Sequence, residues 1–175
     1  LKKSVKKYSP NIEFKVFDES DFTPYEIGLP TGRKLYKKDF KYPKIEIFSK
    51  LNRKDTVYMF IDADSFIFGD ISSYFDLVKD NQILIEYVNN KNGYWAGVKG
   101  LNFVGASKKA GITGLKPISI NSGFIIWNGH QKAFDIALKL IKSKVIFDPK
   151  GISGDEYYIC AGLQKAKANI VPLDY

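Results

Sequence analysis

The sequence contains very little cysteine, histidine and arginine. Cys160 is the only cysteine among 175 residues, which excludes an internal disulfide and a zinc cluster built from cysteines. His130 is the only histidine. No apolar run is long enough to cross a bilayer, and no signal-peptide pattern is present. We therefore expect no transmembrane segment.

Arginine is scarce although the chain is basic. The net charge is +8, which favours an anionic partner. Arg33 and Arg53 are the only arginines, and lysine supplies the remaining positive charge. Because proteins that read base edges depend on the arginine fork, we do not expect nucleic acid as a partner. A solvated lysine-rich surface is the simpler interpretation, and a basic rim around a phosphate pocket is the alternative.

Apolar and aromatic residues are abundant, by contrast. They make up 45% and 15% of the chain, which is too much for a disordered protein. We find no internal repeat and no interdomain linker, so residues 1–175 are expected to form a single domain with a substantial core. Predicted strands and helices alternate along the chain. This alternation predicts an α/β fold with a mostly parallel sheet flanked by helices.

Hydrophobic periodicity places the individual elements. Strands are predicted over residues 12–18, 57–61, 82–88, 118–128 and 170–173. In the first of them Ile12, Phe14 and Val16 alternate inward. Helices are predicted over residues 43–52, 71–78 (with Asp70 as N-cap), 133–141 and 155–167. Residues 89–117 are glycine-rich and are predicted to be a long functional or mobile segment, in which Trp95 is a stacking platform for a sugar or base, or a core or interface ring.

The segment DTVYMFIDADSFIFGD, residues 55–70, holds the clearest functional pattern. Its apolar run, 57–61, predicts a strand buried on both faces. Two acids, Asp62 and Asp64, follow at the carboxyl end of this strand, where ligands bind in open α/β sheets. In an extended backbone both side chains point to one face and so reach one cation. Their oxygens suit Mn²⁺ or Mg²⁺, which bind phosphates; a simple turn is the alternative.

Three segments together carry a resemblance to a known family. YMFIDADSFIFGDISSYFD, residues 58–76, resembles the metal-binding D-x-D segment of the nucleotide-sugar glycosyltransferases of the GT-A fold. The similarity is greatest to the glycogenin-like and bacterial lipopolysaccharide galactosyltransferase-like group. INSGFIIWNG (120–129) and GDEYYICAGL (154–163) are similar to two later motifs of that group, in the same order. The resemblance covers about residues 40–165.

The resemblance implies a GT-A-like (Rossmann-like) domain that acts as a hexosyltransferase. The donor would be a nucleotide-diphosphate sugar, most simply a UDP-sugar, and the acceptor a hydroxyl of a glycan or of a lipid-linked molecule. Asp62 and Asp64 would hold Mn²⁺ or Mg²⁺, which acts as a Lewis acid on the leaving diphosphate. Lys44, Ala63 and Gly123 would complete the donor-binding site.

The resemblance also implies that Asn121 and Asp155 contact the donor sugar or the acceptor as catalytic residues. Asn121 offers a donor and an acceptor to sugar hydroxyls, Gly123 permits close backbone approach, and Asp155 accepts hydroxyl hydrogen bonds or acts as a base. Structural roles remain open for each: strand-end bonding for Asn121, a bulge at Gly123, and helix-dipole stabilisation by Asp155. For Lys44 the alternative is a surface position.

Two features of the family lie outside the matched residues. The family begins with a strand that contacts the nucleotide base, and this strand would precede Leu1. A third metal ligand, often histidine, would follow the last helix, and the position of His130 does not match it. The chain is therefore expected to lack its first strand and its C-terminal segment, which would expose a sheet edge.

Two other functions use the same residues. One is a metal-dependent nucleotidyl- or phosphotransferase, and the other is a non-catalytic domain that binds nucleotide or glycan. We expect a cytoplasmic protein, with attachment to the surface of a membrane as an open alternative.

Overall fold

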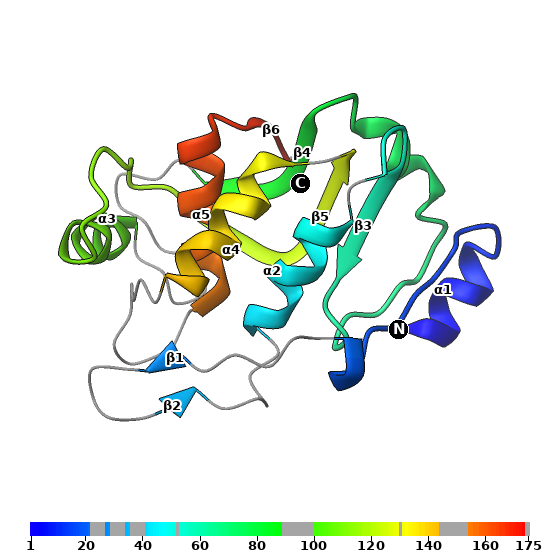
Figure 1. Ribbon diagram of the computed structural model, residues 1–175. Helices are drawn as coiled ribbons and strands as arrows, with labels where there is room; N and C mark the ends of the chain where they lie inside the picture. Colours follow the sequence, from blue (N-terminus) through cyan, green and yellow to red (C-terminus); the bar gives the residue numbers. More distant parts are fainter. Residues whose placement is uncertain are drawn as a thin grey trace.

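The computed structural model describes residues 1–21, 27–28, 34–35, 41–51, 53–88, 100–129, 131–143 and 154–173. The helices are α1 (Lys2–Tyr8), α2 (Lys41–Lys50), α3 (Gly100–Lys109), α4 (Lys132–Lys142) and α5 (Gly154–Ala166), with short 3₁₀ helices η1 (Glu19–Asp21) and η2 (Ser72–Leu77). The strands are β1 (Ile27–Gly28), β2 (Lys34–Leu35), β3 (Val57–Ile61), β4 (Gln82–Val88), β5 (Ser119–Asn128) and β6 (Asn169–Pro172) (Figure 1).

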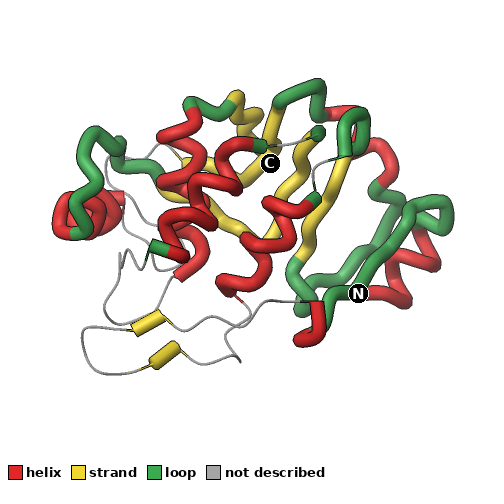
Figure 2. Tube along the Cα trace, viewed as in Figure 1, coloured by secondary structure: helices red, strands yellow, loops and turns green. Residues whose placement is uncertain are grey.

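The central sheet is mixed, with the strand order β3-β5-β4-β6. Among the described strands of this sheet, only β4 and β6 pair in parallel, whereas β5 is antiparallel to both β3 and β4. The α/β class is confirmed, but the prediction of a mostly parallel sheet is wrong. The reason lies in α3, which stands apart from the other helices and does not carry the chain back across the sheet (Figures 1 and 2). The first residue of β5, Ser119, therefore pairs with the last of β4, Val88.

Helices α2, α4 and α5 cover one face of the sheet (Figure 2). The main core lies between these helices and the strands and is rich in aromatic rings. The ring of Phe48 lies 5.0 Å from that of Trp127 and 5.1 Å from that of Phe134. On the opposite face a smaller cluster contains Val78 and Leu84. None of the helices in the described parts is long and apolar enough to cross a membrane.

Most predicted elements are present, with shifts of a few residues at their ends. The helices predicted over 43–52, 133–141 and 155–167 are α2, α4 and α5, and the strands predicted after residue 55 are β3, β4, β5 and β6. The predicted helix over 71–78 is the 3₁₀ helix η2. The prediction of Asp70 as N-cap is wrong, because Ile71 is the N-cap of this helix. Asp70 still bonds to the first turn, since its Oδ1 accepts hydrogen bonds from the backbone N–H and the hydroxyl of Ser72.

Two strand predictions are wrong in detail. Residues 12–18 form no strand: Val16 is 61% exposed, and Phe17 is the residue of this stretch that packs on the core. The alternating pattern predicted a strand, but a strand also needs a neighbouring strand to pair with, and the pattern does not supply one. The prediction that residues 57–61 form a strand buried on both faces is also wrong. These residues form β3, which lies at the edge of the described sheet and is only partly buried.

The glycine-rich stretch, residues 89–117, contains the helix α3, which its composition did not predict. In α3, Phe103 and Ser107 are buried one turn apart, and the Ser107 hydroxyl donates a 2.7 Å hydrogen bond to the Phe103 carbonyl. Gly105 faces solvent between them. Residues 89–99, with Trp95, and His130 lie outside the described residues.

Candidate functional site

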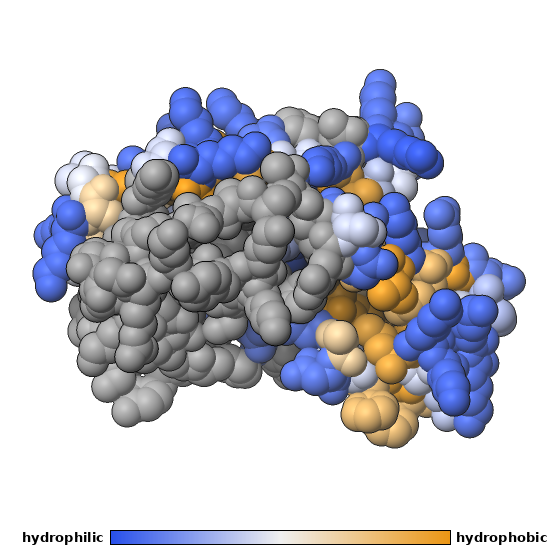
Figure 3. Space-filling view, turned by 60° about the horizontal axis from the view of Figure 1, so that its bottom comes forward, coloured by the Kyte–Doolittle hydropathy of each residue, from blue (hydrophilic) through white to orange (hydrophobic). Residues whose placement is uncertain are grey.

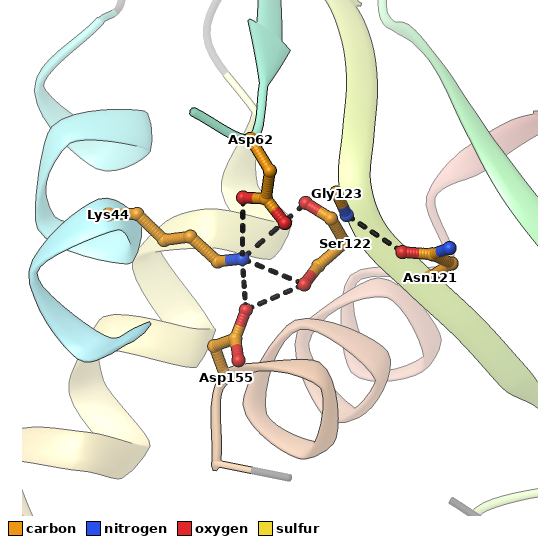
Figure 4. Close-up of polar contacts among 6 residues, drawn as sticks. All are labelled: Lys44, Asp62, Asn121, Ser122, Gly123 and Asp155. Atoms are coloured by element: carbon orange, nitrogen blue, oxygen red, sulfur yellow. Dashed lines mark hydrogen bonds and ion pairs between the residues drawn. The ribbon is translucent and has the colours of Figure 1, made fainter. Parts of the chain in front are cut away.

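A largely buried lysine lies at the centre of the candidate site (Figure 4). The Lys44 side chain is only 13% exposed; its Nζ forms an ion pair with Asp155 and lies 3.9 Å from Oδ1 of Asp62. The same Nζ donates a 2.8 Å hydrogen bond to the hydroxyl of Ser122 and stands 5.2 Å from the centroid of the Phe60 ring. The alternative of a surface position for Lys44 is therefore wrong.

The neighbouring residues of α2 explain why this lysine points inward. Ile45 and Phe48 anchor the helix in the core, so the helix presents Lys44 to the ends of the adjacent strands. Burying an ammonium group is costly unless it is paired and hydrogen-bonded. Two carboxylates and a hydroxyl supply that compensation here.

Asp155 enters the site from the first turn of α5. Its side chain is 7% exposed, and Oδ2 accepts a 2.6 Å hydrogen bond from the Ser122 hydroxyl. A carboxylate is favourable at the N-terminus of a helix, and the positive charge of Lys44 adds to this. The structure thus brings Lys44 and Asp155 together with Ser122, which the sequence had not marked as a site residue.

A bulge in β5 delivers Ser122 to this cluster. Ile85 of β4 pairs with Ile125, but the next residue, Glu86, pairs with Asn121. Residues 122–124 of β5 therefore lack partners in β4, while Phe124 still pairs with Ile61 of β3. Bulges of this kind re-aim side chains and are common beside functional sites. The signal for Ser122 in the sequence was its place between Asn121 and Gly123, but strand alternation alone does not predict the bulge.

Gly123 lies in this bulge and packs against Asp62. Its carbonyl accepts a 2.8 Å hydrogen bond from the Asp62 N–H. A Cβ at position 123 would stand 3.0 Å from Oδ2 of Asp62 and 3.2 Å from Oδ1 of Asn121. That Asn121 oxygen accepts a 2.9 Å hydrogen bond from the Gly123 N–H. The bulge expected as the structural alternative for Gly123 is thus present, and Asn121 satisfies a backbone N–H within β5 rather than at the end of the strand.

Asp62 and Asp64 lie in a turn, not in a strand. β3 ends at Ile61, and the N–H of Ser65 donates a 3.0 Å hydrogen bond to the Asp62 carbonyl, which closes a four-residue turn. The argument that both side chains share one face of an extended strand is therefore wrong. Asp64 and Ala63 are exposed, and the Asp62 side chain is 45% exposed at the edge of the lysine cluster.

The environment of Asp62 disfavours its negative charge. Partial burial raises the pKa of Asp62, Lys44 opposes this rise, and the charges of Asp155 and Asp64 raise the pKa further. A hard divalent cation prefers carboxylate oxygens and would relieve this repulsion. Asp62 and Asp64 are both reachable from solvent, and the absence of a side chain at Gly123 lets the Asp62 carboxylate lie against β5. Carboxylate oxygens are the ligands that Mn²⁺ or Mg²⁺ prefers, so the chemistry of these two residues would suit such an ion.

Comparisons of the chain with protein-family models, with curated proteins and with solved structures gave no match. The functional interpretation therefore depends on the residues and their geometry. The structure gathers Lys44, Asp62, Gly123 and Asp155 at one corner of the sheet, with Asn121 beside Gly123 (Figure 4).

Proposed function

We propose that this chain is a metal-dependent glycosyltransferase domain of the GT-A type. It would move a hexose from a nucleotide-diphosphate sugar, most simply a UDP-sugar, to a hydroxyl of a glycan or lipid-linked acceptor. One observation carries the proposal. Three segments that resemble the family's motifs in sequence meet in space, through Lys44, Asp62, Asp155 and the bulge of β5.

The charge and the exposure of each residue indicate its role in the proposed reaction. Asp62 and Asp64 would hold the cation, which supplies Lewis acidity to the leaving diphosphate. Lys44 places a second positive charge beside the same carboxylate, where it stabilises the negative charge that develops on the leaving group. Ala63 and Gly123 leave room for the donor because neither has a bulky side chain.

Asp155 is best suited to position Lys44. Its side chain is almost fully buried and already accepts bonds from Lys44 and Ser122, which makes it an unfavourable partner for a solvent-borne sugar. We therefore propose that Asp155 acts through the lysine. We propose that Asn121 binds the sugar hydroxyls. Its side-chain oxygen accepts a hydrogen bond from the N–H of Gly123, and its amide N–H groups would donate hydrogen bonds to the sugar.

A non-catalytic binding domain is the second candidate. The ion pair between Lys44 and Asp155 favours a binding domain, because an ion pair of this kind can stabilise the fold without taking part in catalysis. Both candidates require the cation site, but only the enzyme turns over.

Product analysis with the full chain separates these functions. The chain would be incubated with a panel of UDP-hexoses and Mn²⁺, and UDP release and ligand binding would be followed. UDP release that Asp62→Asn abolishes supports glycosyl transfer, and metal-dependent binding without release supports the binding domain. Pyrophosphate release from a nucleoside triphosphate would instead indicate a nucleotidyltransferase. Asp76→Asn, at an exposed position in η2, is the matched control, and an equal loss in that variant would contradict the proposal.

A further inference from the structure

Two aromatic side chains project into solvent directly after the Asp62–Ser65 turn. Phe66 is 73% exposed and Phe68 is 83% exposed, and their rings lie 6.5 Å apart in a nearly parallel arrangement. A single exposed apolar side chain is ordinary, but adjacent ones beside polar residues indicate an interaction surface. Neither ring belongs to either core cluster.

Helix α1 is fastened to the same loop. The N–H of Ile67, between the two phenylalanines, donates a 3.3 Å hydrogen bond to the hydroxyl of Ser4. The Ser9 hydroxyl, just past the helix, donates a 2.8 Å hydrogen bond to Asp70, and Val5 is buried beneath the helix. Residues 1–9 and 65–71 therefore form one continuous surface, which we name the α1 face.

The α1 face combines these rings with a block of positive charge. Helix α1 reads KKSVKKY, and its four lysines, Lys2, Lys3, Lys6 and Lys7, are all exposed. The acid on this face is Asp70, which is already bonded to Ser9 and Ser72, and Asp64 lies just outside it. Figure 3 shows hydrophobic side chains at the lower right of the molecule beside a strongly hydrophilic block. α1 occupies the lower right of Figure 1.

We propose that the α1 face binds the surface of a bilayer that contains anionic lipids. Aromatic rings are favoured at the boundary between headgroups and acyl chains, and clustered lysines are attracted by anionic headgroups. Two rings give too little apolar area for a stable protein–protein interface, and α1 carries no arginine to read bases. The inference is independent of sugar transfer, although it would bring the Asp62–Ser65 turn close to the membrane surface.

Vesicle flotation of the full chain tests the charge requirement. We expect binding to vesicles with about one third phosphatidylglycerol and little binding to pure phosphatidylcholine. Each lysine near such a surface is worth about fivefold in binding, so the loss of all four in K2Q/K3Q/K6Q/K7Q is expected to weaken binding by about two orders of magnitude or more. The matched control K108Q/K109Q/K139Q/K142Q removes the same charge from exposed positions on α3 and α4. Equal weakening in both quadruple variants would overturn the α1 face as the site.

A fluorescent probe tests whether the rings enter the bilayer. Cys160 is buried, and burial raises the pKa of its thiol to about 12, so a thiol-reactive dye at neutral pH would label Phe68→Cys selectively. We expect the emission of this probe to shift to the blue on anionic vesicles, and that of a probe at Lys139→Cys to stay unchanged. An unshifted probe at position 68 would overturn the proposal. The proposal would also be overturned if the wild type were a dimer, F66S/F68S were a monomer, and neither protein bound vesicles.

Discussion

Gly123 lies so close to Asp62 that a methyl group at position 123 would stand 3.0 Å from the Asp62 carboxylate oxygen Oδ2. We predict that Gly123→Ala displaces this carboxylate and weakens metal-dependent donor binding by about tenfold or more, with a loss of stability of about 1–3 kcal/mol from overpacking. Calorimetry and urea unfolding measure the two effects.

Gly105→Ala is the matched control for this substitution. Gly105 is a helical residue of α3, and a methyl group there would meet no described atom outside its own helix within 4 Å. Alanine at this position should therefore raise stability by up to about 1 kcal/mol. Donor binding by this variant should stay unchanged. Wild-type binding by Gly123→Ala would contradict the close approach of Asp62.

The ion pair between Lys44 and Asp155 leads to a second prediction. Lys44→Met would leave the Asp155 carboxylate buried without its cation, and we expect a loss of about 3–5 kcal/mol in the free energy of unfolding. The double variant Lys44→Met/Asp155→Asn should lose much less than the sum of the two single losses, because the residues are directly coupled.

Urea unfolding of the three variants measures this coupling. Lys139→Met, at an exposed site on α4, should change stability by no more than about 0.5 kcal/mol. Strict additivity of Lys44→Met and Asp155→Asn would show that the two groups do not interact in solution.

Asp70 gives the chain a defined dependence on pH. Hydrogen bonds from the hydroxyl and the backbone N–H of Ser72, and then from Ser9, hold the pKa of Asp70 below its usual value of 3.8. Because the folded-state pKa is the lower one, this stabilisation is present above about pH 4 and is lost as the pH falls through the folded-state pKa.

We therefore predict that Asp70→Asn lowers the Tm by a few degrees or less at pH 7. The difference from the wild type should shrink steadily in thermal scans below about pH 4. A difference in Tm that stays constant down to strongly acidic pH would mean that the charge of Asp70 is not what its hydroxyl partners recognise.

The packing of α4 against α5 leads to a fourth prediction. A Cβ at Gly162 would overlap the carbonyl oxygen of Ala133, and a backbone atom cannot move aside without shifting its helix. Gly162→Ala should lower the free energy of unfolding by about 1–3 kcal/mol, although alanine is the better helix former. An unchanged midpoint in urea would show that α4 and α5 are less tightly packed.

The elements with strong, long periodicity were predictable from the sequence. In α4, Phe134 and Ile141 recur at helical spacing and are buried as predicted. Short or glycine-containing segments were not predictable in this way. The segment around Val16 has the alternation of a strand but no neighbouring strand to pair with. The glycines around Gly105 led to no prediction of the helix α3. Periodicity describes a segment alone, whereas pairing depends on the rest of the chain.

The candidate site was predictable only in part, for the same reason. Asp62, Gly123 and Asp155 were each marked by type and position, and they do meet. Ser122 was not selected, because its contact with Lys44 and Asp155 depends on a three-residue bulge that only the pairing of β5 with both neighbours reveals. The low exposure of the Lys44 side chain was likewise unpredictable, since its compensating carboxylates come from distant segments.

The most direct test of the account is a calorimetric titration of the chain with UDP in the presence and absence of Mn²⁺. We predict binding that requires the cation, that Asp62→Ala abolishes and that Asp76→Ala leaves intact. Cation-dependent binding of equal strength in Asp62→Ala and the wild type would contradict the assignment of the site.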